Sequence, residues 1–365
     1  MKKRIIILVA FIFLLSMSII CGREYHIREA MKMSEVQGLN DQFYNEYERI
    51  SDKFIKQTFI TSEHTVLNNQ SILASLNLLY LEYLLETSNQ EEFKQAVRFI
   101  QENLLTEEGL VAFGGFINEG DQDIEHINKS SLQDNFEFYK LLTKAHLTWD
   151  DFYYNDLAEK IADKIFTYHM GDKRLYPYYD KEGEDELLDL PLYYLDLKVL
   201  ASLSEHEALW KEIYQTNKGV LESAYINNNF PLYYSYYDYD EKQYIKNEKI
   251  DTLDSLLVVK QLVYNNLHKK ETIQWLKNQL KTGGIYEQYN SKTGLVTSHT
   301  EKIAIYAVTA QIGKMIGDIE LYTLAMEKML SFQVKDAESE FYGAFMTKDT
   351  DEIDCYTNVQ ALLAF

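Results

Sequence analysis

The sequence predicts an all-α fold, an (α/α)6 toroid of about twelve helices with a substrate groove at one end. Three observations support this prediction. The 365 residues contain only 3 Pro and 15 Gly, so few residues interrupt helices. Apolar residues recur with helical spacing along most of the chain. Short aromatic segments recur between the predicted helical pairs, and in a toroid such loops gather at one end. An open solenoid of helical pairs is the alternative, but it has less reason to carry an aromatic loop in each unit.

The N-terminal segment has the pattern of a targeting sequence. Lys2–Arg4 is positively charged, and Ile5–Ile20 is a continuous run of apolar and small residues. Cys21 is a potential lipid attachment point. We therefore expect residues 1–22 to be a signal peptide or membrane anchor, with cleavage, lipidation and retention all left open. Residues 23–365 are expected to form a single (α/α)6 domain, extracytoplasmic and either secreted or anchored to the cell membrane.

The predicted helices follow in order, each with an apolar face at helical spacing. Asp41–Lys56 is the first. Asn68–Glu86 is the second and has a wide apolar side, with Ile72, Leu76 and Leu79 on it. The remaining predicted helices are Gln90–Leu104, Ser130–His146, Tyr154–His169, Pro191–Leu203, His206–Ser223, Asp251–Asn265, Lys270–Leu280, Lys302–Ile316, Ile319–Phe332 and Tyr356–Ala364.

Charge and composition exclude several classes of function. The net charge of -21 argues against nucleic acid, anionic membrane surfaces and polyanionic substrates as partners, because binding phosphate needs a basic face. The two cysteines, Cys21 and Cys355, cannot form a disulfide framework. The eight His are scattered without the spacing of metal ligands, and the sequence has no phosphate-binding glycine loop or Gly-x-Ser-x-Gly motif. We therefore expect neither a metal nor a cofactor.

Carboxylates and aromatic residues remain, and these are the functional groups of a glycosidase. The chain contains 29 Tyr, whose flat ring and hydroxyl suit both core packing and stacking on sugars. Among the tyrosines of the aromatic loops, we predict that Tyr178, Tyr233 and Tyr286 stack on substrate and that most others are packing residues. The aromatic loops are Leu110–Phe113, Leu175–Tyr179, Phe230–Tyr234, Ile285–Tyr289 and Phe341–Phe345.

Several segments resemble the motifs of glycoside hydrolase family 8, which includes bacterial endoglucanases and glycosidases of exopolysaccharide operons. Thr61-Ser62-Glu63, before the second predicted helix, resembles the family's Thr-Ser-Glu-Gly-Gln motif. Ser130–Asn135 resembles its Ser-x-x-Asp segment, and Asn229–Asp238 resembles its Pro-Asp-Trp-x-x-Tyr-Asp segment. Asp251–Leu256 stands where the family has Tyr-Asp-Ala-x-Arg, and Tyr356–Phe365 is similar to its C-terminal motif. The resemblance extends from Thr61 to the last residue.

The resemblance implies roles for four carboxylates. Glu63 would be the catalytic acid, although its position alone also fits a helix-capping acid. Asp254 or Asp251 would be the base, and Asp134 would hold the sugar at the cleavage site. The family cleaves with inversion of configuration. The sequence departs from the motifs at His64, where the family has Gly, and lacks the Arg of the base motif.

The implied function is a secreted or membrane-anchored glycoside hydrolase that cleaves a β-linked exopolysaccharide within the chain. Its partners would be the polysaccharide substrate and a membrane polysaccharide-synthase complex. A catalytically weak or inactive polysaccharide-binding or assembly protein on the same fold is the alternative, and the unusual base motif favours it. An (α/α)6 polysaccharide lyase is a third possibility, but its anionic substrate conflicts with the chain's negative charge.

Overall fold

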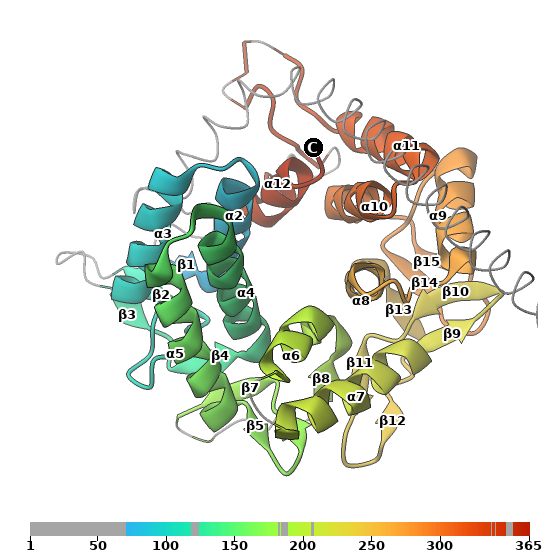
Figure 1. The fold of residues 1–365 in the computed structure, drawn as a ribbon. Helices are drawn as coiled ribbons and strands as arrows, with labels where there is room; N and C mark the ends of the chain where they lie inside the picture. The colour runs from blue at the N-terminus through green and yellow to red at the C-terminus, as the bar shows by residue number, and fades with distance from the viewer. Residues whose placement is uncertain are drawn as a thin grey trace, which may run out of the picture.

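The computed structural model describes residues 71–117, 124–181, 183, 189–205, 208–336, 338–339, 341–347 and 353–365. Within these residues, eleven α-helices form two concentric layers around a ring (Figure 1). The inner helices are α2 (Ala74–Glu86), α4 (Leu132–Trp149), α6 (Leu197–Leu203), α8 (Thr252–Tyr264), α10 (Ile303–Ile316) and α12 (Cys355–Leu362). The outer helices are α3 (Gln90–Asn103), α5 (Phe152–Tyr168), α7 (Ala208–Ser223), α9 (Lys270–Thr282) and α11 (Ile319–Leu330).

The ring is closed by the last helix. α12 packs against α10 on one side and against α2 on the other, so the C-terminal helix lies beside the first described helix (Figure 1). One core cluster of buried side chains extends from Ile72 to Phe365. The predicted toroid is therefore confirmed, and an open solenoid is excluded. The predicted helix Asp41–Lys56 and the N-terminal segment 1–22 lie outside the described residues. None of the described helices is long and apolar enough to cross a membrane.

Short antiparallel sheets accompany the starts of the inner helices. β1 (Ser71–Leu73), β4 (Lys129–Ser131) and β13 (Lys249–Asp251) each run directly into an inner helix. Because the outer helices return the chain, consecutive inner helices run in the same direction, and these strands gather at one end of the ring. The other strands are β2 (Gly114–Ile117), β3 (Ile124–His126), β5 (Met170–Gly171), β6 (Arg174–Leu175), β7 (Tyr178–Asp180), β8 (Asp189–Pro191), β9 (Tyr225–Asn227), β10 (Phe230–Tyr233), β11 (Tyr236–Asp238), β12 (Gln243–Tyr244), β14 (Gln288–Asn290) and β15 (Val296–Ser298).

The second predicted helix begins later than its apolar pattern indicated. Helix α2 starts at Ala74, not at Asn68, because Ser71–Leu73 pairs with β2 as a strand. Gly114 of β2 permits this pairing, since a Cβ at that position would lie 2.1 Å from the carbonyl oxygen of Ile72. A strand partner more than forty positions along the chain therefore overrides the local helical pattern.

The predicted helix Pro191–Leu203 is also shorter in the structure. Pro191 ends β8, which pairs with β11, and a 3-10 turn, η1 (Leu192–Tyr194), follows it. α6 begins only at Leu197, where the side chain of Asp196 accepts hydrogen bonds from the backbone of Lys198 and Val199. The other predicted helices that fall on described residues are reproduced to within a few residues at their ends.

Candidate active site

Two carboxylic acids occupy matching positions on two inner helices. Asp134 is the third residue of α4, and Asp254 is the third residue of α8. Each helix follows a short strand and is capped by the strand's last residue, Ser131 in α4 and Asp251 in α8. The same local construction thus places an acid in the first turn of each helix, at the end of the ring where the strands gather.

The carboxyl group of Asp134 is almost completely buried. Its side chain is 7% exposed, and Ser131 Oγ donates a 2.6 Å hydrogen bond to its Oδ2. Burial raises the pKa of Asp134 to about 7. The hydrogen bond from Ser131 opposes this increase, and the charge of Glu137 adds to it. A substantial fraction of Asp134 is therefore protonated near neutral pH, and this form can donate a hydrogen bond.

Asp254 is half-buried and faces a tyrosine. The hydroxyl of Tyr236 lies 3.5 Å from its Oδ2. Burial raises the pKa of Asp254 to about 6, and the charge of Asp251 raises it further, whereas Tyr236 and Lys302 lower it. This pKa leaves Asp254 mostly ionised at neutral pH and close to the value that suits a general base.

Asp251, the other predicted base, has a structural partner. Its Oδ1 accepts a 3.2 Å hydrogen bond from the backbone N–H of Asp254 and so caps α8. Its Oδ2 lies 4.0 Å from Lys302 Nζ, which makes a 2.7 Å ion pair with Glu287. The two aspartates therefore differ: Asp251 is held by the helix end and a lysine, and Asp254 faces an aromatic neighbour.

A continuous row of five half-buried aromatic rings ends at Asp254. Ring centroids are 5.8 Å apart for Phe113 and Tyr178, 5.9 Å for Tyr178 and Tyr194, 5.2 Å for Tyr194 and Tyr193, and 6.2 Å for Tyr193 and Tyr236. All four contacts are edge-to-face, the arrangement that aromatic pairs favour.

The tyrosine hydroxyls in this row are paired as well as the rings. The hydroxyls of Tyr178 and Tyr194 are 3.2 Å apart, and those of Tyr193 and Tyr236 are 3.3 Å apart. Burial raises the pKa of both Tyr193 and Tyr194, so both hydroxyls remain protonated. The nearby charges include Asp254 for Tyr193 and Asp134 for Tyr194, which links the row to both acids.

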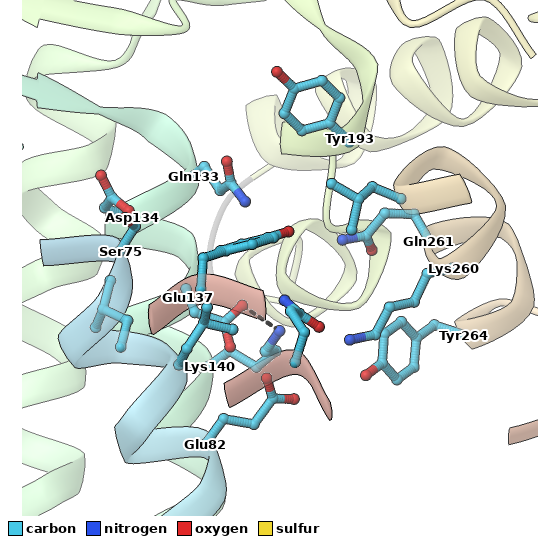
Figure 2. A pocket seen from close by; sticks show the side chains of 15 residues that line it. Ser75, Glu82, Gln133, Asp134, Glu137, Lys140, Tyr193, Lys260, Gln261 and Tyr264 are labelled. Carbon is cyan, nitrogen blue, oxygen red and sulfur yellow. Dashed lines mark hydrogen bonds and ion pairs between the residues drawn. The ribbon is translucent and has the colours of Figure 1, made fainter. Parts of the chain in front are cut away.

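A cavity of about 100 Å³ lies between inner helices α2, α4, α8 and α12 (Figure 2). Asp134 and Gln133 border it from α4, and Tyr193 borders it from η1. Glu82 approaches it from α2, Glu137 and Lys140 from α4, and Lys260 from α8. Its lining residues are Ser75, Leu78, Leu79, Glu82, Gln133, Asp134, Glu137, Lys140, Tyr193, Leu257, Lys260, Gln261, Tyr264, Tyr356 and Gln360.

The charges around this cavity compensate one another. Lys140 Nζ lies 2.5 Å from Glu137 Oε2 and 3.4 Å from Asp196 Oδ2. Burial alone would lower the pKa of Lys140, but Glu137, Asp196 and Glu82 together hold it well above its usual value. Burial would raise the pKa of Glu82, yet Lys260 and Lys140 outweigh that effect and lower it. The cavity is therefore bordered by a buried ionic network.

Glu63, the predicted catalytic acid, lies outside the described residues. The helix that it was expected to precede starts at Ala74, eleven positions after Glu63, and the first turn of α2 contains no acidic residue. Among the described residues, no group of three or more His, Cys, Asp or Glu side chains is arranged to hold a metal ion.

The three predicted stacking tyrosines have different surroundings. Tyr178 belongs to the row of rings described above. Tyr286 is half-buried, with its ring 5.1 Å from that of His299 and its carbonyl oxygen bonded to Thr252 Oγ1 at the start of α8. The stacking role predicted for Tyr233 does not fit its position: the residue is 1% exposed and packs on Tyr225, so no ring face is open to a sugar.

Sequence reasoning did not single out Tyr193, Tyr194 or Tyr236. The adjacent pair after Pro191 was the available signal for the first two. Tyr236 belongs to Asn229–Asp238, a segment that resembles a family motif, but the sequence alone does not indicate that it contacts Tyr193 and Asp254. Strand β11 pairs Tyr236 with Pro191 of β8, and this pairing brings the three rings together.

No known family model matches the sequence, and no curated protein matches it. Solved structures do match it. An α-amylase from Clostridium perfringens is 27% identical, with a TM-score of 0.78 over 87% of this chain and 96% of that chain. PssZ from Listeria monocytogenes is 16% identical, with a TM-score of 0.65 over 86% of this chain and 93% of that chain.

Endoglucanase Cel10 from Klebsiella pneumoniae, a family 8 glycosyl hydrolase, is 13% identical, with a TM-score of 0.60 over 86% of this chain and 97% of that chain. The similarities thus cover nearly the whole length of each neighbour. They agree with the closed double ring of helices and with the motif resemblance in the sequence. This chain therefore has the fold of the family 8 glycosyl hydrolase that it matches.

Proposed function

We propose that the protein is an inverting glycoside hydrolase that cleaves a β-linked exopolysaccharide within the chain. The observation that carries this proposal is the pair of carboxyls in the first turns of α4 and α8, Asp134 and Asp254. Both have raised pKa values, to about 7 and about 6. Carboxyls with tuned pKa values are the functional groups of glycosidic bond cleavage, and here Asp254 would serve as the base and Asp134 as a ligand of the sugar.

Asp254 is the proposed general base. Above about pH 6 its carboxylate is ionised and can take a proton from water. The hydroxyl of Tyr236, 3.5 Å from Oδ2, orients this carboxylate and favours its charged form. Asp251 is the less suitable base because its Oδ1 already caps α8 and its Oδ2 faces Lys302.

Glu63 is the proposed proton donor, on the basis of the Thr-Ser-Glu motif. In an inverting mechanism the donor and the base are roughly 6.5–9.5 Å apart, which leaves space for the attacking water. Asp134 is the proposed sugar ligand, since its protonated carboxyl can donate a hydrogen bond to a ring hydroxyl. Tyr178 and Tyr286 retain the proposed stacking role, and the aromatic row supports adding Tyr193 and Tyr194.

An extracytoplasmic location is part of the proposal. It rests on Lys2–Arg4 followed by Ile5–Ile20, the pattern of a signal peptide or anchor. In that compartment the enzyme would meet an exported polymer, and a membrane polysaccharide synthase is the proposed partner.

A non-catalytic polysaccharide-binding protein on the same fold is the second candidate. One specific observation favours it: the first turn of α2 carries no acid, unlike the first turns of α4 and α8. In this alternative, the aromatic row would bind the polymer and no bond would be cleaved.

The decisive experiment incubates the chain from about Gly22 onward with β-glucans, chitosan, bacterial exopolysaccharides and soluble starch, and measures new reducing ends. Starch is included because one structural neighbour is described as an α-amylase. The proposal expects cleavage of a β-linked polymer, products of inverted anomeric configuration, and a loss of roughly 10² to 10⁴ in rate for Glu63→Gln. Binding without cleavage of any polymer would favour the second candidate.

A further inference from the structure

A second cavity lies at the outer rim of the ring, away from the candidate active site. Its volume is about 450 Å³. It is formed where the β5–β6 turn, helix α7 and the β11–β12 hairpin meet, and these elements lie together at the periphery in Figure 1. Its lining residues are Asp172, Lys173, Arg174, Thr216, Val220, Tyr237, Tyr239 and Lys242.

Strand β11 separates this cavity from the candidate active site. Successive side chains of a strand point to opposite faces. Tyr236 contacts Asp254, and the next residue, Tyr237, lines the outer cavity. The two sites therefore use opposite faces of one strand, and a change at Tyr237 need not alter the surroundings of Asp254.

Two half-buried tyrosine rings form the wall of the cavity. The rings of Tyr237 and Tyr239 are 5.5 Å apart and nearly perpendicular, at 87°. Tyr239 is fixed by a 2.5 Å hydrogen bond from its hydroxyl to Asn217, and Tyr237 also packs on the ring of Tyr244 at 5.2 Å. Within the described part of the chain, the hydroxyl of Tyr237 makes no hydrogen bond. The fixed ring of Tyr239 and the unbonded hydroxyl of Tyr237 together form a surface that suits a sugar, which offers both apolar faces and hydroxyl groups.

The cations at the rim differ in their pairing. Lys173 Nζ lies 3.2 Å from Glu212, and Arg174 lies 2.5 Å from Asp240. Lys242 has no acidic side chain within ion-pair distance among the described residues. It occupies the turn between β11 and β12 with a φ of 51°. The cavity therefore contributes one ammonium group without an acidic partner in the part of the chain that the structure describes, and the carboxylate of Asp172 also lines it.

We propose that this cavity is a second carbohydrate-binding site, which takes a sugar unit with a carboxylate substituent. The sugar ring stacks on Tyr237, and the carboxylate pairs with Lys242. This inference rests on the proposed function only in taking a polysaccharide as the ligand. Because the chain's net charge of -21 repels a dense polyanion, the site suits a polymer in which acidic units are sparse.

The test is native affinity electrophoresis of the Asp254→Asn protein, which leaves the polymer intact. One gel contains hydroxyethyl cellulose, which is neutral, and a second contains lightly substituted carboxymethyl cellulose. The parent is expected to be retarded by both and more strongly by the carboxylated polymer. Tyr237→Leu keeps an apolar side chain but removes the flat ring, and should weaken retardation about tenfold in both gels.

Two further variants guard against a folding defect in Tyr237→Leu. Lys242→Asn suits the left-handed backbone and should abolish only the preference for the carboxylated polymer. Thr216→Trp, at an exposed position on α7, should obstruct the cavity and weaken retardation in both gels. Phe152→Leu is the matched control, because Phe152 is 68% exposed and does not line the cavity.

The outcomes separate this inference from the proposed hydrolysis. Loss of retardation in Tyr237→Leu and Thr216→Trp, with unchanged retardation in Phe152→Leu, supports the second site even if the wild-type protein cleaves no polymer. A parent protein retarded by neither gel, or retardation unchanged by both cavity variants, would overturn it. If Lys242→Asn retained the preference for carboxymethyl cellulose, the acidic part of the proposal would be rejected.

Discussion

The hydroxyl of Tyr236, in the connection between α7 and α8, lies 3.5 Å from Oδ2 of Asp254. Tyr236 is on β11, which is held by pairing with β8, and Asp254 is in the first turn of α8. Burial and the charge of Asp251 raise the pKa of Asp254 to about 6, and the tyrosine hydrogen bond limits this rise. The contact therefore lowers the pH at which the proposed base becomes active.

Replacing this tyrosine should shift the pH dependence of hydrolysis. Wild-type kcat/KM is expected to fall as the pH drops through about 6, because Asp254 becomes protonated. Tyr236→Phe removes a hydrogen bond that favours the carboxylate, so the pKa of Asp254 and the acidic limb should both move to higher pH. Tyr237→Phe, the next residue on the strand, is the control and should leave the limb in place. An acidic limb at the same pH in both variants would contradict this role of Tyr236.

The two aspartates of α8 should respond differently to replacement by asparagine. Asp254→Asn is expected to reduce the rate of hydrolysis by roughly 10² to 10⁴ while the protein stays folded. Asp251→Asn keeps a residue that can cap a helix, so the expected loss of stability is about 1 kcal/mol or less. Its effect on rate should be smaller than that of Asp254→Asn. Steady-state kinetics and urea unfolding measure the two effects, and the reverse ranking in rate would identify Asp251 as the base.

The buried carboxyl of Asp134 should make the wild-type protein less stable as the pH rises. Its folded-state pKa is about 7, against 3.8 as the ordinary value, so the native state binds the proton more tightly than the unfolded state. The stability from this proton is fully present below about pH 4 and is lost as the pH rises through about 7. A difference of about three pH units corresponds to about 4 kcal/mol.

Asp134→Asn cannot ionise and should lack this pH dependence. Urea unfolding of both proteins at mildly acidic and mildly alkaline pH measures the difference in unfolding free energy between them. The wild-type protein should lose stability relative to the variant as the pH is raised. An equal difference at both pH values would mean that the pKa of Asp134 is not raised.

The ionic network around the cavity between α2, α4, α8 and α12 should be sensitive to the loss of one partner. Lys140→Met leaves Glu137 and Asp196 buried without their cation, and we expect a loss of about 3–5 kcal/mol in unfolding free energy. Lys173→Met, which breaks an exposed pair with Glu212, is the control and should cost about 1 kcal/mol or less. Similar costs for the two variants in urea unfolding would show that the buried network is not strongly coupled.

Local patterns were sufficient to predict most helices and the acids at their ends. α3 and α8 begin within a residue of the expected positions, because apolar spacing and a capping side chain such as Asn89 or Asp251 act within one turn. Because these signals are local, they also predicted that Asp134 and Asp254 lie at the starts of helices. Helical hairpins with aromatic loops likewise predicted the toroid, because hairpin-sized units of this kind bury their apolar faces by closing into a ring.

The tertiary structure decided features that depend on residues far apart in the sequence. Pairing with β2 made Ser71–Leu73 a strand, and pairing of β8 with β11 brought Tyr193 to Tyr236. Tyr178 and Tyr233 look alike in sequence, yet packing left the first half-buried in the aromatic row and enclosed the second completely. The pKa of Asp134 is likewise set by burial, which depends on the surrounding elements and is not encoded by any local pattern.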